Sequence, residues 1–424
     1  MSHKATAFVV ALVLVVFGCS FLAHAELRAG IANMVVTPDP LLPVSGGVGI
    51  PEPVEKKLGE LEVRALVIEQ GDTRVAIVSM PFLGFPSILC DRIRAKVEDI
   101  PHDNIIIGST HVHSAPDMYA FGDEKGNTLA DLNYIDKVCG QTADAINQAL
   151  ANVKPAGVKI ATDKANGKIA YNYYAEKLYD PRCSVLQFVG QDGKPFATLV
   201  NYAIHPEIIG PDQKILSPDL VGPLYERIAA NGGGMGIFMN SAQGGMITAD
   251  CRGPEGKDIQ TWDECIRIGN LLADEALRIV SGAAVQQDPK LLCAATKITF
   301  PIESLLMLAV IANSPLKYPM NPDKSVTTLV NVVNLGNAQI LTIPGEALPN
   351  IGFYLKRKMK GENNLLFGLT NDAFGYILTK EDFNSFERYN YVSRTSLGEK
   401  TGTILVDEAL KFVDSLPAPE KLQK

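Results

Sequence analysis

The sequence lacks several patterns that define whole classes of protein. It has seven cysteines but no C-x-x-C pair, so a zinc site built on cysteine thiolates has no support. No basic run stands out, and the formal net charge of −8 argues against nucleic acid as a partner. After the first 25 residues, no apolar run is long enough for a transmembrane helix. Internal repeats and low-complexity tracts are also absent.

The first 25 residues have the pattern of a secretory signal peptide. Lys4 precedes an apolar run from Ala5 to Phe17, and Ala23-His24-Ala25 is an A-x-A cleavage site. We therefore expect a signal peptide over 1–25 and a secreted or periplasmic mature chain over 26–424, soluble and one charge more negative than −8 because Lys4 is lost. Lipoprotein processing at Cys19 is the minority alternative, because Phe17 fits that pattern poorly.

An even number of cysteines follows the signal peptide, in a compartment where disulfides can form. Six cysteines allow 15 pairings, and a chain of this size does not need any of them. Of these pairings we expect only Cys251–Cys265. The six residues are Cys90, Cys139, Cys183, Cys251, Cys265 and Cys293.

The order of apolar patterns predicts an α/β fold. Two β-rich segments, 61–69 and 73–80, flank Gln70-Gly71-Asp72, which has the composition of a hairpin turn. Helical and extended patterns then alternate along the chain. This mixture predicts a single large domain with mixed β-sheets flanked by helices. We expect helices over 87–97, 134–150, 219–230, 261–280, 346–358 and 400–416, and strands near 105–107, 158–161, 184–189, 196–204, 235–239, 294–300, 327–335, 338–343 and 365–369.

The most informative segment is 104–116, in which an apolar strand pattern runs into two histidines. His111 and His113 make up half of the histidines that follow residue 25. If the backbone stays extended, side chains two residues apart lie on one side of it, so both imidazoles converge at the end of the strand. Imidazole is the commonest metal ligand in proteins, but a hydrogen-bonded structural pair fits these two residues equally well.

Other unusual polar residues also follow predicted strands. His205 comes directly after the strand at 196–204, and a glycine-rich segment, Asn240 to Gly245, follows the strand at 235–239. Ligand sites in open α/β sheets form at strand ends, so these segments predict one shared cleft.

Four segments, in this order along the chain, resemble the amidase domain of neutral, or alkaline non-lysosomal, ceramidases. The resemblance extends from Ala29 to about Tyr376 and to the last helix, and the C-terminal β-sandwich of full-length ceramidases has no room here. The four segments are Gly108-Ser109-Thr110-His111-Val112-His113-Ser114-Ala115-Pro116, Asn201-Tyr202-Ala203-Ile204-His205-Pro206, Ile343-Pro344-Gly345-Glu346 and Thr370-Asn371-Asp372-Ala373-Phe374-Gly375-Tyr376.

The resemblance implies one zinc ion per chain, held by His111, His205, Glu346 and Tyr376. Nitrogen and oxygen donors of these kinds suit zinc and leave a position open for water or substrate. Without the resemblance, Glu346 reads as a residue that favours a helix dipole and Tyr376 as a core aromatic residue.

Two further residues are catalytic candidates by the same resemblance. His113 would face the substrate and either hydrogen-bond the developing oxyanion or shuttle a proton, although it could instead orient a neighbouring residue. Asp372 would hold its loop or a metal ligand in place, and a capping role is the alternative.

The chain departs from the family at the proposed nucleophile. Ceramidases carry a serine in a Gly-Asp-x-Ser-Pro-Asn segment, and the aligned residue here is Ile247. Thr248 replaces this serine only if the loop is shifted, and Ser241 only after a larger movement. We therefore favour attack by zinc-activated water, assisted by His113 and by the amides of Gly244-Gly245 as oxyanion donors.

The sequence thus predicts an exported zinc-dependent hydrolase that cleaves a non-peptide amide bond of a small or lipid-like N-acyl substrate. Peripheral contact with a membrane is part of this expectation. The alternatives are a zinc-dependent esterase or lactonase, a non-catalytic protein that binds ligands in the metal cleft, and a fold in which the histidines are only structural.

Overall fold

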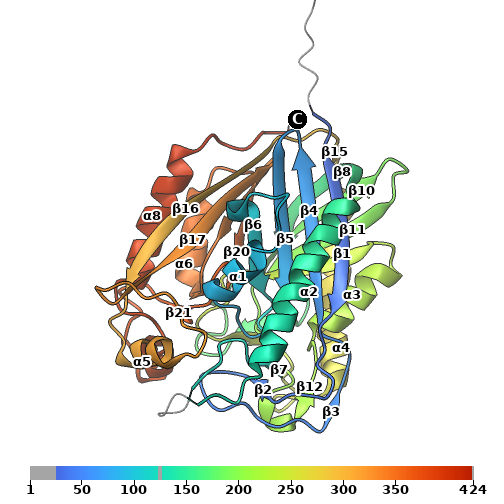
Figure 1. Cartoon of the computed structure of the whole chain (residues 1–424). Coiled ribbons are helices and arrows are strands. Elements are labelled where there is room, and N and C mark those ends of the chain that lie inside the picture. Colours follow the sequence, from blue (N-terminus) through green and yellow to red (C-terminus); the bar gives the residue numbers. More distant parts are fainter. Residues whose placement is uncertain (1–24, 123–126, 423–424) are drawn as a thin grey trace, which may run out of the picture.

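The computed structural model describes residues 25–122 and 127–422 (Figure 1). The predicted signal peptide, with Cys19, lies outside these residues. The fold is α/β with mixed sheets in a single domain, as predicted. Within the described part of the chain, no helix is both long and apolar enough to cross a membrane.

The larger sheet contains the predicted hairpin and ends in parallel pairs. Strands β4 (Glu62–Gln70) and β5 (Thr73–Met80) pair antiparallel around the turn, while β5 pairs parallel with β6 (Ile105–Ser109). At the other end, β11 (Pro195–Tyr202) pairs parallel with β13 (Met235–Asn240). The spatial order is β13, β11, β10 (Arg182–Gly190), β8 (Lys154–Lys164), β1 (Arg28–Val35), β4, β5 and β6, and β15 (Val285–Gln286) adds to β8.

The two ends of this sheet approach each other. The hydroxyl of Ser79, on β5, donates to the carbonyl of Phe238, on β13, at 2.6 Å. The guanidinium of Arg64, on β4, donates to the carbonyl of Gly236 at 2.9 Å. The segments that follow β6 and β11 therefore lie close together although many strands separate them within the sheet.

Four layers, in the order helices, large sheet, second sheet and helices, enclose three hydrophobic cores. Helices α1 (Ser87–Arg94), α2 (Leu132–Ala151), α3 (Val221–Ala230) and α4 (Trp262–Ser281) cover one face of the large sheet. The other face packs on a second sheet through residues such as Ile77, Phe188 and Phe367. Helices α6 (Pro349–Lys358) and α8 (Thr401–Ser415) cover the outside of that sheet (Figure 1). The second sheet runs β16 (Leu291–Pro301), β17 (Ser325–Leu335), β18 (Ala338–Thr342) and β20 (Asn363–Phe367).

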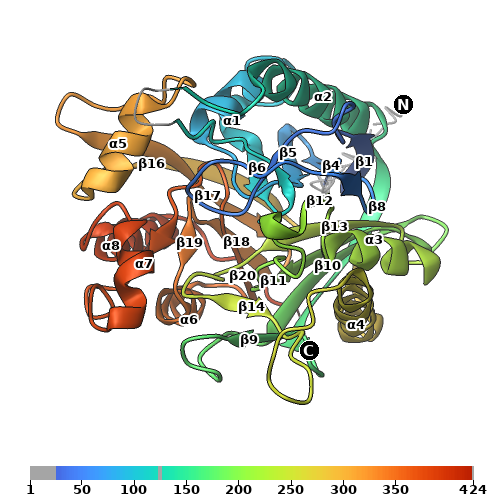
Figure 2. The ribbon, with the colours of Figure 1, turned by 90° about the horizontal axis from the view of Figure 1, so that it is seen from below.

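Short elements gather at the lower end of the layers, where the loops meet (Figures 1 and 2). They are β2 (Val44–Ser45), β3 (Lys56–Lys57), β7 (Ala115–Pro116), β9 (Ala170–Asn172), β12 (Ile215–Leu216), β14 (Ile247–Ala249), β19 (Glu346–Ala347), β21 (Tyr376–Ile377), α5 (Leu305–Asn313) and α7 (Asn390–Arg394).

Two predictions about local structure are wrong. Glu346 does not begin a helix, because its backbone pairs in parallel with Tyr376 and the proline that favours a helix start is Pro349. Cys251 and Cys265 are both unpaired and buried, as thiols. The thiol of Cys265 instead forms a hydrogen bond with the side chain of Asp219.

Candidate metal centre

The backbone turns sharply between β6 and the first histidine. β6 ends at Ser109, and His111 has a φ of 72°, a conformation uncommon for any residue but glycine. The amide of His111 donates to the carbonyl of Phe82 at 3.0 Å. The backbone is therefore not extended at His111, but the imidazoles still converge: the ring centre of His111 lies 4.7 Å from that of His113 and 4.6 Å from that of His205.

Backbone carbonyls fix the orientation of two imidazoles. Nδ1 of His111 donates to the carbonyl of Leu83 at 2.6 Å, and Nδ1 of His205 donates to the carbonyl of Ile247 at 2.8 Å. A carbonyl only accepts, so each Nδ1 carries a hydrogen and each Nε2 faces the centre of the cluster. Metal-ligating histidines are held in this way in known metalloproteins.

Glu346 completes a triad with these two rings. Its Oε2 lies 3.1 Å from Nε2 of His205 and 3.4 Å from Nε2 of His111. Four ligands at zinc bond lengths of ~2.0–2.1 Å in a tetrahedron lie about 3.3 Å apart. The distances from the carboxylate to both imidazoles therefore fit a tetrahedral zinc ion, and two imidazoles and one carboxylate are donors of the right kind.

The buried side chains of Glu346 and His205 shift each other's pKa. Burial opposes the charged carboxylate, but His111 and His205 hold the pKa of Glu346 well below its usual range. Burial also opposes protonation of His205, but the hydrogen bond to Glu346 raises its pKa to about 9. In the metal-free chain the raised pKa of His205 favours a proton on both ring nitrogens, and a metal ion held by His111, His205 and Glu346 would take the place of the proton on Nε2.

His113 is the third histidine of the cluster. One ring nitrogen from each of His111, His113 and His205 lies within 4.8 Å of the others. Nδ1 of His113 lies 3.6 Å from Oε2 of Glu207, and its Nε2 is buried without a hydrogen-bond partner in the described chain. Burial, reinforced by the neighbouring imidazoles, lowers the pKa of His113 well below its usual value, so the ring is neutral. An orphaned buried nitrogen of this kind points to a ligand.

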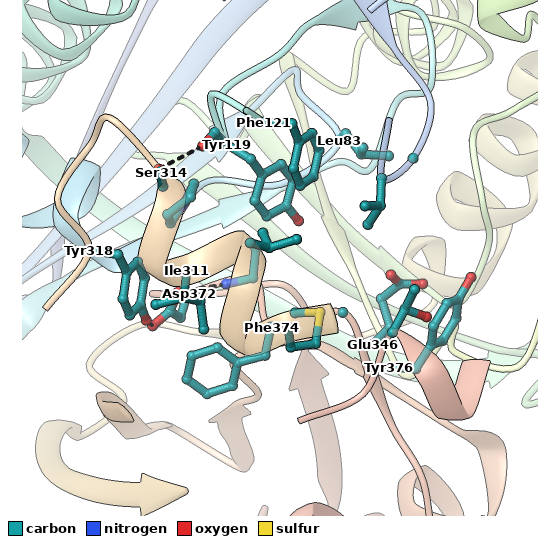
Figure 3. Close-up of a pocket in the computed structure, with 18 of the residues that line it drawn as sticks. Leu83, Tyr119, Phe121, Ile311, Ser314, Tyr318, Glu346, Asp372, Phe374 and Tyr376 are labelled. Carbon is teal, nitrogen blue, oxygen red and sulfur yellow. Dashed lines mark hydrogen bonds between the residues drawn. The ribbon is translucent and has the colours of Figure 1, made fainter. Parts of the chain in front are cut away.

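Tyr376 reaches the same pocket from β21, beside Glu346 (Figure 3). Its hydroxyl donates to the sulfur of Met246 at 3.4 Å, which is a weak acceptor. Burial, followed by the charge of Glu346, raises the pKa of Tyr376 well above its usual value. Its phenol is therefore protonated in the metal-free chain.

Asp372 lies on another wall of the pocket and holds the loop that carries it (Figure 3). Its Oδ1 accepts from the amides of Ser87 at 3.1 Å and Ala373 at 2.9 Å, and its Oδ2 accepts from the hydroxyl of Tyr318. Burial raises the pKa of Asp372 to about 6. Tyr318 and Ser87 carried no signal in the sequence, because only tertiary contacts bring them to Asp372.

The residues around the missing serine have other roles. The side chain of Ile247 is fully buried, and its carbonyl accepts from both the amide and Nδ1 of His205, at 2.7 and 2.8 Å. Thr248 lines a separate cavity with Glu207, not the pocket of the metal triad. The amide of Gly244 donates to the carbonyl of Ala347 at 3.0 Å, so it is not the free oxyanion donor that we expected.

The pocket above the triad is mainly apolar, and α5 forms one of its walls (Figure 3). Sequence patterns do not predict α5, because all of its residues except Asn313 are apolar and they show no helical stripe. The apolar side chains that line the pocket are Val48, Leu83, Pro86, Phe121, Met307, Val310, Ile311, Leu316, Ala373 and Phe374.

Comparison with solved structures places the fold: it is ceramidase-like. The crystal structure of neutral ceramidase from Pseudomonas aeruginosa matches 94% of this chain and 76% of its own length, with a TM-score of 0.75 and 15% sequence identity. A structure of ceramidase complexed with C2 matches 94% of this chain and 77% of its own, with a TM-score of 0.73 and 16% identity. No protein-family model and no curated protein sequence matches the chain.

Proposed function

We propose that the protein is an exported zinc-dependent hydrolase that cleaves the amide bond of an N-acyl substrate. The observation that carries this proposal is the buried triad of His111, His205 and Glu346, whose facing atoms have the spacing of zinc ligands. The ceramidase-like fold supports it. We include Tyr376 as the fourth ligand because its phenol lies in the same pocket.

A bound zinc ion supplies a Lewis acid that polarises a carbonyl and lowers the pKa of water towards ~7. The protein supplies the rest of the site. Nε2 of His113 is neutral and unpaired, so it can form a hydrogen bond to a substrate oxygen or to the leaving nitrogen. The apolar walls exclude bulk water, which strengthens such hydrogen bonds.

The hydroxyl groups in the pocket favour water over a side-chain nucleophile. Ser314 and Thr395 line the pocket, but Ser314 donates to the carbonyl of Tyr119 at 3.3 Å and Thr395 to that of Tyr391 at 2.8 Å. Among the described residues, neither hydroxyl has a carboxylate or an imidazole as its hydrogen-bond partner, and Thr248 lies in the other cavity. Activation of a serine or threonine requires such a base.

The apolar lining supports an acyl chain as the part of the substrate that enters the pocket. A buried methylene group contributes about 0.8 kcal/mol, so a longer chain binds more tightly until the pocket is filled. An ester or a lactone has the same carbonyl and is the alternative substrate. The other alternative is a non-catalytic protein that binds such molecules without hydrolysing them. It is favoured by the presence of Ile247 at the position that the resemblance aligns with the family's serine.

One experiment separates these functions. Purified full-length mature protein is analysed for metals and then tested on panels of N-acyl amides, esters and lactones, with chelator and with zinc restored. We expect about one zinc per chain and amide turnover that stops with chelator and returns with zinc. Zinc without turnover on any panel would favour the binding protein, and the absence of metal would refute the proposal.

A further inference from the structure

Asn240 is the last residue of β13, and its fully buried side chain lies behind both histidine segments. Its Nδ2 donates to the carbonyl of Thr110 at 3.1 Å and to the carbonyl of Ile204 at 2.7 Å. Thr110 and Ile204 directly precede His111 and His205 in the sequence. One amide group therefore binds the backbone in front of each imidazole of the triad.

The orientation of this amide follows from its other contacts. Its Oδ1 accepts from the backbone amides of Ile204 at 3.2 Å and Ser241 at 3.0 Å. Backbone N–H groups only donate, so the oxygen must face them and the NH₂ group must face the two carbonyls. All four hydrogen bonds require the same orientation of the Asn240 amide group, so this side chain is a rigid link between the two histidine segments.

The two segments share a backbone hydrogen bond, from the amide of His113 to the carbonyl of Pro206 at 3.2 Å. They follow β6 and β11, which are not neighbours in the sheet, so no strand pairing within the described chain sets the separation of Thr110 and Ile204. His111 also adopts a positive φ, a strained conformation for a residue with a side chain, which persists only where surrounding contacts hold it. The bond from Asn240 to Thr110 restrains the residue immediately before this turn.

We propose that Asn240 is a positioning residue of the metal centre and that its side-chain NH₂ group sets the separation of His111 and His205. This inference rests on the proposed metal-dependent function. A buried polar residue that only stabilises the core would change the stability of the protein without changing its metal affinity. A positioning residue changes the metal affinity as well.

The test compares three variants of the mature protein. Asn240→Ala removes the amide, and Asn240→Asp keeps the size and both acceptor contacts but cannot donate to the two carbonyls. Asn334→Ala is the matched control: Asn334 is buried on β17, donates to the carbonyl of Pro417 at 2.9 Å and touches neither histidine segment. For each protein we would measure Zn²⁺ affinity by chelator competition, the visible spectrum with Co²⁺ and the melting temperature without metal.

We expect both Asn240 variants to lose about 10–100-fold in Zn²⁺ affinity, with an altered Co²⁺ spectrum, as for residues that orient metal ligands. Asn334→Ala should lower only the melting temperature. If Asn240→Ala does not fold, Asn240→Asp carries the comparison. Unchanged affinity and spectrum in a folded Asn240 variant would overturn the positioning role alone, whereas a wild-type protein that binds neither metal overturns the proposed function as well.

Discussion

At the scale of single residues, Ile247 occupies the position that the resemblance aligns with the serine of ceramidases. The isoleucine side chain enters the core, and its carbonyl orients His205. No hydroxyl is therefore available at this position, while the carbonyl of Ile247 supports one of the proposed metal ligands. The residues that remain in the pocket support the proposed hydrolysis at a metal ion.

We expect His111→Ala and His205→Ala to lose bound metal and to reduce turnover by more than about 100-fold, because each removes a ligand. Thr248→Ala should keep most of the activity, since Thr248 lines the other cavity. His102→Ala is the control, because His102 is exposed and outside the cluster. Metal analysis and kinetics check this, and loss of turnover in Thr248→Ala with zinc still bound would restore the hydroxyl nucleophile.

A second prediction concerns pH and Asp372. Its pKa is raised to about 6 by burial, against about 4 in an unfolded chain, so between these values the native state binds the proton more tightly. Its contribution therefore lowers the free energy of unfolding as the pH rises from about 4 to 6, by up to roughly 2–3 kcal/mol. Asp372→Asn should remove this slope. Urea unfolding of both metal-free proteins at several pH values measures it, and parallel pH profiles would contradict it.

At the scale of elements, Glu346 is positioned by a short strand rather than by a helix. β19 lies against the glycine-rich segment after β13 so closely that a Cβ on Gly244 would lie 2.1 Å from the carbonyl oxygen of Glu346. The absence of a side chain at Gly244 therefore permits this contact, and the contact sets the position of the Glu346 carboxylate in the pocket.

Gly244→Ala should displace β19 and lower Zn²⁺ affinity by at least about tenfold, since it moves a metal ligand. The matched control is Gly140→Ala within α2, where a Cβ meets nothing within 4 Å. That change should stabilise the protein by roughly 0.5–1 kcal/mol, as alanine favours a helix. Chelator competition and thermal unfolding measure both effects. Equal Zn²⁺ affinity in the two variants would show that β19 tolerates the movement.

Helix α5 suggests how an apolar substrate reaches the pocket. It carries no charged residue, and its Leu305 is 82% exposed. Its Leu306 lines a second groove together with Ile50, which is 71% exposed. Some of its other side chains line the pocket itself. We therefore propose that this face makes the peripheral membrane contact expected from the sequence, with the pocket opening towards the lipid.

Leu305→Asp and Ile50→Asp should each weaken binding to phosphatidylcholine vesicles by about tenfold or more, because each removes an apolar side chain from the lipid contact. Ile266→Asp is the control: Ile266 is 37% exposed on α4, on the side of the molecule away from α5 (Figure 2). Vesicle sedimentation measures binding. An equal loss in all three variants, or no binding by the wild type, would rule out this face.

At the scale of the whole molecule, the metal centre joins parts of the chain that are remote in sequence. His111 follows β6, at one end of the large sheet, and His205 follows β11 of the same sheet. Glu346 follows β18 of the second sheet. Any ion bound by all three links the two sheets. A metal ion that binds only the native state stabilises it by mass action.

Removal of metal should therefore lower the melting temperature of the whole protein, by several degrees at saturating Zn²⁺, and restored Zn²⁺ should reverse it. The reason is that the triad forms only when both sheets are in place. Differential scanning calorimetry with and without chelator measures the shift. His205→Ala should show no response to chelator, and a wild-type protein with no response would contradict a tightly bound structural link.

The sequence by itself determined the elements whose pattern is local. The hairpin of β4 and β5, helices α2, α4 and α8, and the positions of His111 and His205 after strands all follow from periodicity and turn residues. The tertiary structure alone decided the rest. The positive φ of His111, the short strand at Glu346, the all-apolar α5 and the carbonyls that orient both imidazoles depend on contacts between distant segments, which no local pattern encodes. Local patterns single out the two histidines and the resemblance adds Glu346, but only the tertiary structure brings the carboxylate to 3.1 and 3.4 Å from their Nε2 atoms.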